Sequence, residues 1–172
     1  MDMLRTPGPA DLDALLALSN VHEREIGAIA KPAFEELVFM SFRTRMTEAG
    51  DAFLIALADR APEVAPNYHW FAGRFDRFVY IDRVVVAAAS RKRGLATLLY
   101  RDLIDASRRA GHTRLCCEVN SDPPNPASDA FHATFGFEEI GRAYLPDRGK
   151  TVRYLTLTLR GECPRSTARL CP

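Results

Sequence analysis

A basic turn between an apolar strand and a helix is the part of this sequence best suited to chemistry. The strand is expected from Val79 to Ala87 and the helix from Leu95 to Arg109, and the turn contains Arg91-Lys92-Arg93-Gly94-Leu95-Ala96. The first N–H groups of a helix have no acceptor inside the helix, and the helix dipole favours negative charge there. Gly94 lets the backbone approach a phosphate closely, and the basic residues add positive charge. The turn therefore predicts a site for a dianionic group such as a pyrophosphate.

The spacing of this turn excludes two commoner phosphate loops. A P-loop requires G-x-x-x-x-G-K-[ST] and a dinucleotide fingerprint requires G-x-G-x-x-G, and neither pattern occurs in the chain. A basic helix start is also typical of a simple solvated cap. A second motif is needed to decide between the two interpretations.

That second motif follows a strand expected from Thr113 to Val119. It reads Asn125-x-x-Ser128-x-x-Phe131-His132-x-x-x-Gly136-Phe137. With R-x-x-G-x-A at the turn, it resembles the signatures of the GNAT acetyltransferase superfamily, [QR]-x-x-G-x-[GA] and N-x-x-[AS]-x-x-[FL]-Y-x-x-x-G-F. The resemblance is firm over roughly residues 78–159, and the stretches 66–86 and 122–132 look like those of a little-characterised bacterial-type branch.

The resemblance implies a fold and a co-substrate. The fold would be α/β, a mixed and mostly antiparallel sheet flanked by helices and splayed at its centre. Acetyl-coenzyme A (acetyl-CoA) would bind in the splayed crevice, where its pantetheine arm pairs with backbone like an added strand. The residues implied to line that arm are Val84, Val85 and Val86. The residues implied to hold the pyrophosphate are Arg91, Lys92, Arg93, Gly94, Leu95, Ala96 and Thr97.

Two residues of the second motif have more than one interpretation. Asn125 stands where the family contacts the arm or ordered water, and it also suits the N-cap of a helix from Pro126 to Phe135. His132 stands where the family usually has a Tyr thought to protonate the leaving thiolate. A neutral imidazole still donates one N–H, so His132 could act as this acid with a different pH profile. It could equally be a satisfied polar residue on a helix.

An amine acceptor calls for a base, because a lysine-like amine with a pKa of about 10.4 is mostly protonated at neutral pH. Asp82 lies on the strand before the turn, and Glu118 lies on the strand that follows the helix. Either carboxylate could serve, directly or through water. Each could instead face solvent or pair with an Arg.

These observations predict an N-acetyltransferase that moves an acetyl group to a small-molecule or peptide amine by direct attack in a ternary complex. Two alternatives stay open: an acyl-CoA-binding module without turnover, and an acyltransferase with a longer acyl group or a hydroxyl acceptor. A homodimer also stays open, since dimers are frequent in the resembled family.

Composition narrows the partners. The net charge is +1, which argues against general binding to nucleic acid or a membrane surface. There is no apolar run of the ~18 residues that a membrane span requires, and no secretory h-region, so a cytoplasmic location is predicted.

The four cysteines have no metal-ligand spacing, and no metal is predicted. Adjacent Cys116 and Cys117 should face opposite sides of their strand, and a Cys163–Cys171 disulfide is conceivable.

The remaining elements complete a single domain over residues 1–160, followed by a loose tail at 161–172. Helices are expected from about Leu12 to Asn20, with Asp11 as N-cap, and from Ala33 to Met40. Further strands are expected at Phe42–Thr47, Ala52–Ala58, Phe137–Tyr144 and Thr151–Leu159. Residues 20–31 and 61–73 are expected to be loops. The aromatic residues 68–80 are expected either to cover the acceptor or to pack in the core, and His22 and Glu23 are weaker acceptor candidates.

Overall fold

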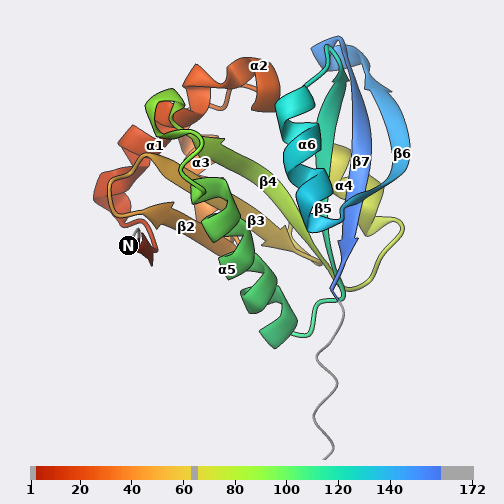
Figure 1. Ribbon diagram of the computed structural model, residues 1–172, viewed down its shortest axis with the longest axis horizontal. Coiled ribbons are helices and arrows are strands. Elements are labelled where there is room, and N and C mark those ends of the chain that lie inside the picture. Colours follow the sequence, from red (N-terminus) through yellow and green to blue (C-terminus); the bar gives the residue numbers. More distant parts are fainter. Residues whose placement is uncertain (1–2, 63–65, 160–172) are drawn as a thin grey trace, which may run out of the picture.

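The computed structural model describes residues 3–62 and 66–159, which form one open sheet with helices on both faces (Figure 1). The strands are β1 (Leu4–Arg5), β2 (Arg43–Thr47), β3 (Ala52–Ala58), β4 (Phe78–Val86), β5 (Arg114–Asp122), β6 (Glu138–Leu145) and β7 (Lys150–Thr158). The helices are α1 (Leu12–Val21), α2 (Glu23–Ile26), α3 (Lys31–Met40), α4 (Pro66–Ala72), α5 (Leu95–Arg109) and α6 (Pro126–Phe135). Short 3₁₀ turns occupy Pro9–Asp11, Ala88–Ser90 and Pro146–Arg148.

The strand order is β1-β2-β3-β4-β5-β7-β6. Neighbouring strands are antiparallel except at the centre, where β4 and β5 run parallel. A mixed, mostly antiparallel sheet is thus confirmed. The parallel pair is possible because α5 carries the chain back to the end of the sheet at which β4 begins, so that β5 can run in the same direction as β4.

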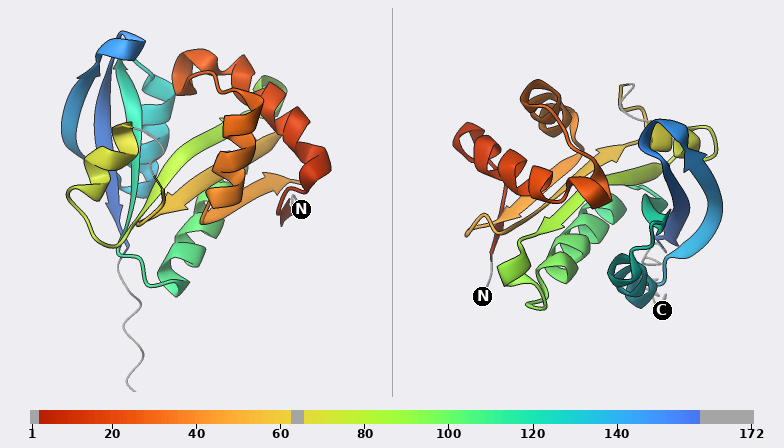
Figure 2. Two further views of the ribbon diagram at one scale, coloured as in Figure 1. Left: turned by 180° about the vertical axis from the view of Figure 1, so that it is seen from behind. Right: turned by 90° about the horizontal axis from the view of Figure 1, so that it is seen from above.

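The sheet divides the core into two layers, and each layer is covered by helices (Figure 2). One face of the sheet packs against α1, α3 and α4 through residues such as Leu15, Phe34 and Phe71. The other face packs against α5 and α6. Helix α5 is amphipathic, because Leu95, Leu99 and further apolar residues at helical spacing are buried while the exposed positions are charged. Its amphipathic face fixes the helix start beside the end of β4.

Most predicted elements are confirmed, three of them to the residue: the strand 52–58 and the helices 95–109 and 126–135. The predicted loops at 20–31 and 61–73 were wrong in part, because they contain α2 and α4. In α4, Tyr68 and Phe71 lie one helical turn apart and both are buried. Tertiary burial therefore makes this segment helical, although its sequence has few strong helix formers. The two-residue strand β1 was also not predicted.

The cysteine and tail predictions have mixed outcomes. Cys116 and Cys117 are buried free thiols in the two opposite core layers, as strand alternation requires. The tail at 161–172, with Cys163 and Cys171, lies outside the described residues. In the parts that the structure describes, none of the helices is long and apolar enough to cross a membrane. In the same parts, no three or more His, Cys, Asp or Glu side chains gather as metal ligands.

Candidate active site

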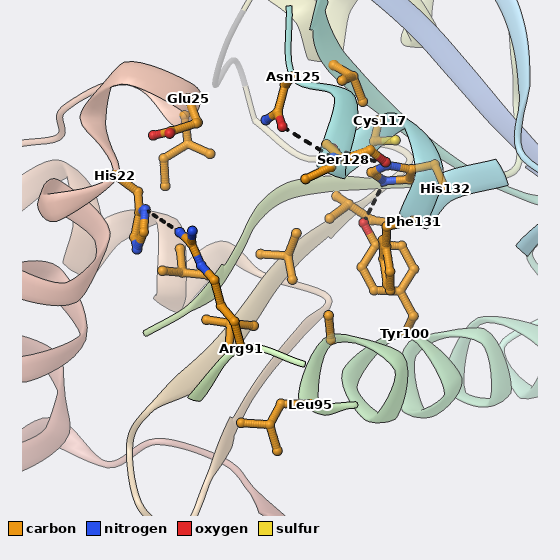
Figure 3. A pocket seen from close by; sticks show the side chains of 18 of the residues that line it. His22, Glu25, Arg91, Leu95, Tyr100, Cys117, Asn125, Ser128, Phe131 and His132 are labelled. Atoms are coloured by element: carbon orange, nitrogen blue, oxygen red, sulfur yellow. Dashed lines mark hydrogen bonds between the residues drawn. The ribbon is translucent and has the colours of Figure 1, made fainter. Parts of the chain in front are cut away.

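A pocket of about 730 Å³ opens where β4 and β5 separate (Figure 3). The two strands pair only from Phe78 to Tyr80 on β4, opposite Arg114 to Cys116 on β5. Beyond these three pairs, each strand continues toward a different part of the sheet. Every catalytic or cofactor-binding residue predicted from the sequence lines this pocket except Arg93. The splayed strands thus bring together residues from both motifs.

The floor of the pocket is the free edge of β4. Val84, Val85 and Val86 pair with β3 on one side, and their other side borders the pocket that β5 has left. The side chain of Val85 is buried in one core layer, and those of Val84 and Val86 pack against the other. The backbone of this segment is therefore available to an extended ligand, while its side chains hold the strand in place.

The turn of residues 91–97, here called the anion turn, closes one end of the pocket. Gly94 has φ +79°, and no atom lies within 4 Å of the place where its Cβ would be. The first hydrogen bond of α5 runs from Leu98 N to Gly94 O, so the N–H groups of the preceding residues have no acceptor within the helix. Leu95, Ala96 and Thr97 line the pocket. These free donors at a positive helix end suit an anion.

The three basic residues of the anion turn have different positions. Arg91 and Lys92 are exposed and line the pocket. Arg93 instead reaches the Asp51 carboxylate at 3.1 Å. Arg91 also approaches His22 Nδ1 at 3.4 Å, which joins the α1–α2 corner to the turn. Arg91 and Lys92 can therefore add charge to the pocket, whereas Arg93 ties the turn to the loop between β2 and β3.

Two carboxyl groups occupy the other part of the pocket, here called the carboxylate end. Glu118 accepts hydrogen bonds of 2.8 Å from the Tyr80 hydroxyl and from Asn67 Nδ2. Burial raises the pKa of Glu118 to about 7, and the nearby Asp82 adds to the rise, while the two hydrogen bonds oppose it. A carboxyl group with this pKa changes its charge near neutral pH, as a general base should.

Asp82 occupies an irregular place on β4. The register between β3 and β4 passes directly from Ile81 to Arg83, so Asp82 has no residue opposite it. An extra residue of this kind forms a β-bulge, which bends the strand and redirects side chains. Asp82 lies 3.1 Å from the buried Arg83 guanidinium. Burial raises the pKa of Asp82, and the positive charges of Arg83 and Arg148 oppose this rise.

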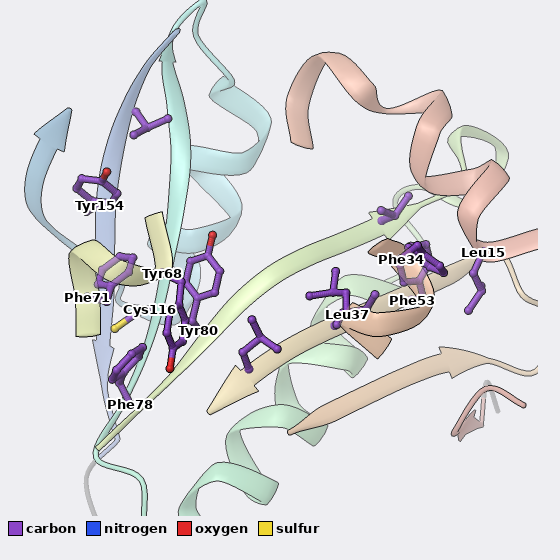
Figure 4. Packing of buried hydrophobic residues seen from close by; sticks show 14 of the residues in the cluster. Leu15, Phe34, Leu37, Phe53, Tyr68, Phe71, Phe78, Tyr80, Cys116 and Tyr154 are labelled. Carbon is purple, nitrogen blue, oxygen red and sulfur yellow. The ribbon is translucent and has the colours of Figure 1, made fainter. Parts of the chain in front are cut away.

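Glu118 depends on aromatic residues that are buried between the sheet and α4 (Figure 4). Tyr80 is fully buried, and Tyr154 donates to Asn67 Oδ1 at 3.0 Å, which orients the amide toward Glu118. Trp70 stacks on Tyr154 with ring centroids 4.0 Å apart. The aromatic stretch 68–80 therefore packs mainly in the core, one of the two interpretations left open by the sequence.

The third polar group is His132 on α6. Its side chain is buried, and its ring contacts Tyr100 Oη at 2.9 Å and Ser128 O at 2.8 Å. Burial lowers the pKa of His132, with partial opposition from the Ser128 carbonyl and the Asp129 charge. The imidazole is therefore neutral at neutral pH.

Asn125 caps α6 and also lines the pocket, as both interpretations of the sequence expected. Its side-chain oxygen accepts a hydrogen bond from Ser128 N at 3.2 Å and so caps α6. Asn125 also lines the pocket. Because its oxygen serves the cap, its NH₂ group is the part that can donate to a ligand.

Some residues of the pocket were missed or misplaced in the sequence analysis. Asn67 lies in a segment expected to be a connection, and no sequence signal links it to Glu118. Tyr100 lies in a helix that was predicted, but its contact with His132 spans 32 positions. Of the two acceptor candidates in the α1–α2 corner, His22 lines the pocket and Glu23 does not, whereas Glu25 does.

The strand order and the splayed centre are those of the GNAT acetyltransferase fold. The sequence model described as "Acetyltransferase (GNAT) family" matches residues 52–137. The chain belongs to this family. The match begins at β3, earlier than the motifs suggested, and ends with Phe137 of the second motif.

Solved structures agree on the fold. The ribosomal-protein-S18-alanine N-acetyltransferase of Escherichia coli is 17% identical, with a TM-score of 0.65 over 96% of this chain and 98% of its own. The Salmonella typhimurium protein yncA, solved with its cofactor acetyl-CoA, is 18% identical, with a TM-score of 0.68 over 97% and 99%. Arabidopsis thaliana NAA60, in complex with a bisubstrate analogue, is 16% identical, with a TM-score of 0.74 over 94% and 100%. No curated protein sequence matches the chain.

Proposed function

We propose that this acetyltransferase moves an acetyl group from acetyl-CoA to a primary amine by direct attack in a ternary complex. The observation that carries the proposal is that one pocket joins the anion turn to Glu118. The pyrophosphate of acetyl-CoA would bind at the turn, and the pantetheine arm would follow the free edge of β4. The thioester would then lie between the splayed strands, near the carboxylate end.

Glu118 is proposed as the base. Attack requires a neutral amine, so a group that takes up a proton near neutral pH lowers the barrier. Glu118 has this property because its pKa is about 7. Asp82 is a less suitable base because its neighbour Arg83 is buried and depends on it for charge balance. Its negative charge instead supports the raised pKa of Glu118 and can attract a cationic acceptor.

Direct attack is favoured over a covalent acyl-enzyme. Cys117 is the cysteine that lines the pocket, but burial raises the pKa of its thiol well above the usual range. A thiol that stays protonated is a poor nucleophile. Holding the amine and the thioester side by side would supply much of the rate instead.

The acceptor class is proposed as a small-molecule or peptide amine. The similar structures named above include an enzyme that acetylates a protein alanine, which is consistent with the peptide case. A homodimer and a cytoplasmic location remain predictions. An acyltransferase with a longer acyl group or a hydroxyl acceptor would differ in its preference among acetyl, propionyl and succinyl thioesters.

A binding module without turnover is the second candidate. It is favoured by one observation, that both ring nitrogens of His132 are engaged by neighbouring groups. His132 then has no N–H directed at the pocket in its neutral form.

Calorimetric titration with acetyl-CoA, with ATP and NAD as controls, tests the binding step. Selective micromolar binding supports the proposal, and a thiol-release assay over a panel of amines then tests turnover. Binding without release for every amine would favour the binding module. No binding would reduce the anion turn to a helix cap and would overturn the proposed function.

A further inference from the structure

Tyr100 and His132 form a buried polar pair between α5 and α6. Tyr100 has no exposed surface, and its ring packs against Phe131, Phe135 and Phe137. The pair meets through Tyr100 Oη and His132 Nε2 at 2.9 Å. Both residues also line the pocket (Figure 3). The pair is thus an internal contact placed at the surface where a substrate would lie.

The neighbours of His132 determine where its proton lies. A backbone carbonyl can only accept, so the contact of 2.8 Å with Ser128 O requires the proton on Nδ1. In a neutral imidazole the other nitrogen, Nε2, then has no hydrogen and must accept. Tyr100 is therefore the donor in the pair. Its hydroxyl carries the hydrogen that joins the pair.

Tyr100 lines the same pocket as the proposed base. The negative charge of Glu118 is among the causes that raise the pKa of Tyr100, after burial and the Cys117 thiol. Tyr100 belongs to the core layer that packs against α5, whereas Glu118 is hydrogen-bonded to Tyr80 of the other core layer, so the two residues border the pocket from opposite faces of the sheet. A thioester held between them would meet the base on one side and a hydroxyl on the other.

Building on the acetyl transfer proposed above, we propose that Tyr100 donates its hydroxyl hydrogen bond to the sulfur of CoA as the C–S bond breaks. His132 is then a positioning residue that holds this hydroxyl in the resting enzyme. The new C–N bond forms, the C–S electron pair moves to sulfur, and the amine proton passes to Glu118. The sulfur leaves as a thiolate and takes a proton from water.

Tyr100 stabilises the thiolate without giving up its proton. A phenol is already a weaker acid than a thiol, with pKa values of about 10 and 8.5, so the proton remains on oxygen. A hydrogen bond to an anion is about twice as strong as one between neutral groups. The hydroxyl therefore stays hydrogen-bonded to the neutral Nε2 of His132 while the thioester is intact. It donates its hydrogen bond to sulfur instead when negative charge develops there. An interaction that forms only as the bond breaks accelerates the reaction.

The thiol pKa of bound CoA tests this inference. The protein is saturated with CoA, and the ultraviolet absorbance of the thiolate is followed as pH rises, against protein alone. We expect the thiol pKa to lie below that of free CoA, and Tyr100→Phe to raise it by about one pH unit or more. Tyr144→Phe makes the same chemical change at an exposed position outside the pocket and should leave it unchanged.

A second pair of variants guards against a folding defect. Tyr100→Phe leaves His132 Nε2 without its partner, whereas replacing both residues by Phe removes both polar groups. The double variant should show the raised thiol pKa, and His132→Phe alone, which keeps the hydroxyl but removes the group that holds it, should raise the thiol pKa less than Tyr100→Phe does. Equal thiol pKa values with and without the Tyr100 hydroxyl would overturn the inference. So would a rise in His132→Phe alone as large as the rise in Tyr100→Phe, which would make His132 the donor.

The same titration separates this inference from the proposed function. Failure of the unmodified protein to bind CoA would overturn both. Binding and turnover with an unchanged thiol pKa in Tyr100→Phe would overturn only the role of Tyr100.

Discussion

The anion turn and the carboxylate end belong to one pocket but depend on the chain in opposite ways. The anion turn consists of seven consecutive residues, and its donors are backbone N–H groups at the start of α5. At the carboxylate end, Glu118 is held by Tyr80 and Asn67, which lie 38 and 51 positions away. The first region is a local motif that any helix start can supply. The second exists only once the sheet and α4 have packed together.

This difference predicts separate roles for the two regions. The anion turn should determine how tightly CoA binds, with little influence on the chemical step. The carboxylate end should determine turnover and its pH dependence, with little influence on CoA affinity. Substitutions at each region therefore test whether CoA binding and turnover depend on separate residues.

The largest effect on CoA binding is expected from Gly94→Glu, at the anion turn. It places a carboxylate where a pyrophosphate would bind and a side chain where φ is +79°. Two like charges about 4 Å apart repel by roughly 4 kcal/mol near a protein surface, so affinity for CoA should fall at least ~100-fold. Calorimetry measures the loss. Gly136→Glu is the matched control, because Gly136 has a similar φ of +82° and open space but lies outside the pocket. Equal affinity in the two variants would refute the anion site.

Glu118→Gln should separate chemistry from binding. The amide keeps the size of the side chain but cannot take up a proton, so turnover should fall roughly 10²- to 10⁴-fold. CoA affinity should change little, because the anion turn is untouched. Steady-state kinetics and calorimetry on the same samples measure both. A loss of affinity as large as the loss of turnover would contradict the division between the two regions.

The same contrast explains which parts of the site could be predicted from the sequence. That the anion turn binds a pyrophosphate stays a prediction, but its place in the pocket could be predicted residue by residue, because this place follows from a strand, a glycine and a helix start. Arg93 was the exception, since its partner Asp51 comes from another turn. Glu118 was a candidate, but nothing in the sequence indicated its pKa or its partners. Asn67 lies in α4, a helix that forms because Tyr68 and Phe71 are buried rather than from local preference.

Tyr80→Phe should shift the pH dependence rather than abolish activity. The variant keeps the buried ring and removes one of the two hydrogen bonds that stabilise charged Glu118. The pKa of Glu118 should therefore rise further above about 7. Activity requires the charged base, so the acid limb of kcat/KM should move to higher pH by about one unit.

The control for this shift is Tyr68→Phe. Tyr68 is also buried, but its hydroxyl contacts Ala58 O and Ala61 N instead of Glu118. A similar displacement of the acid limb in both variants would indicate a general packing effect and would remove Glu118 from the role of base.

The smallest effects should come from the basic residues of the anion turn, and they test the turn on its own. Arg91→Ala removes an exposed charge that lines the pocket, so CoA affinity should fall by about 5-fold, as for one exposed ion pair of about 1 kcal/mol. Arg93→Ala should change affinity less than about 2-fold, because Arg93 does not line the pocket and reaches Asp51. Equal losses in both would show that Arg93 contacts the pyrophosphate, as the sequence predicted. Unequal losses would mean that the direction of the side chain, and not its charge alone, determines which basic residues of the anion turn bind the anion.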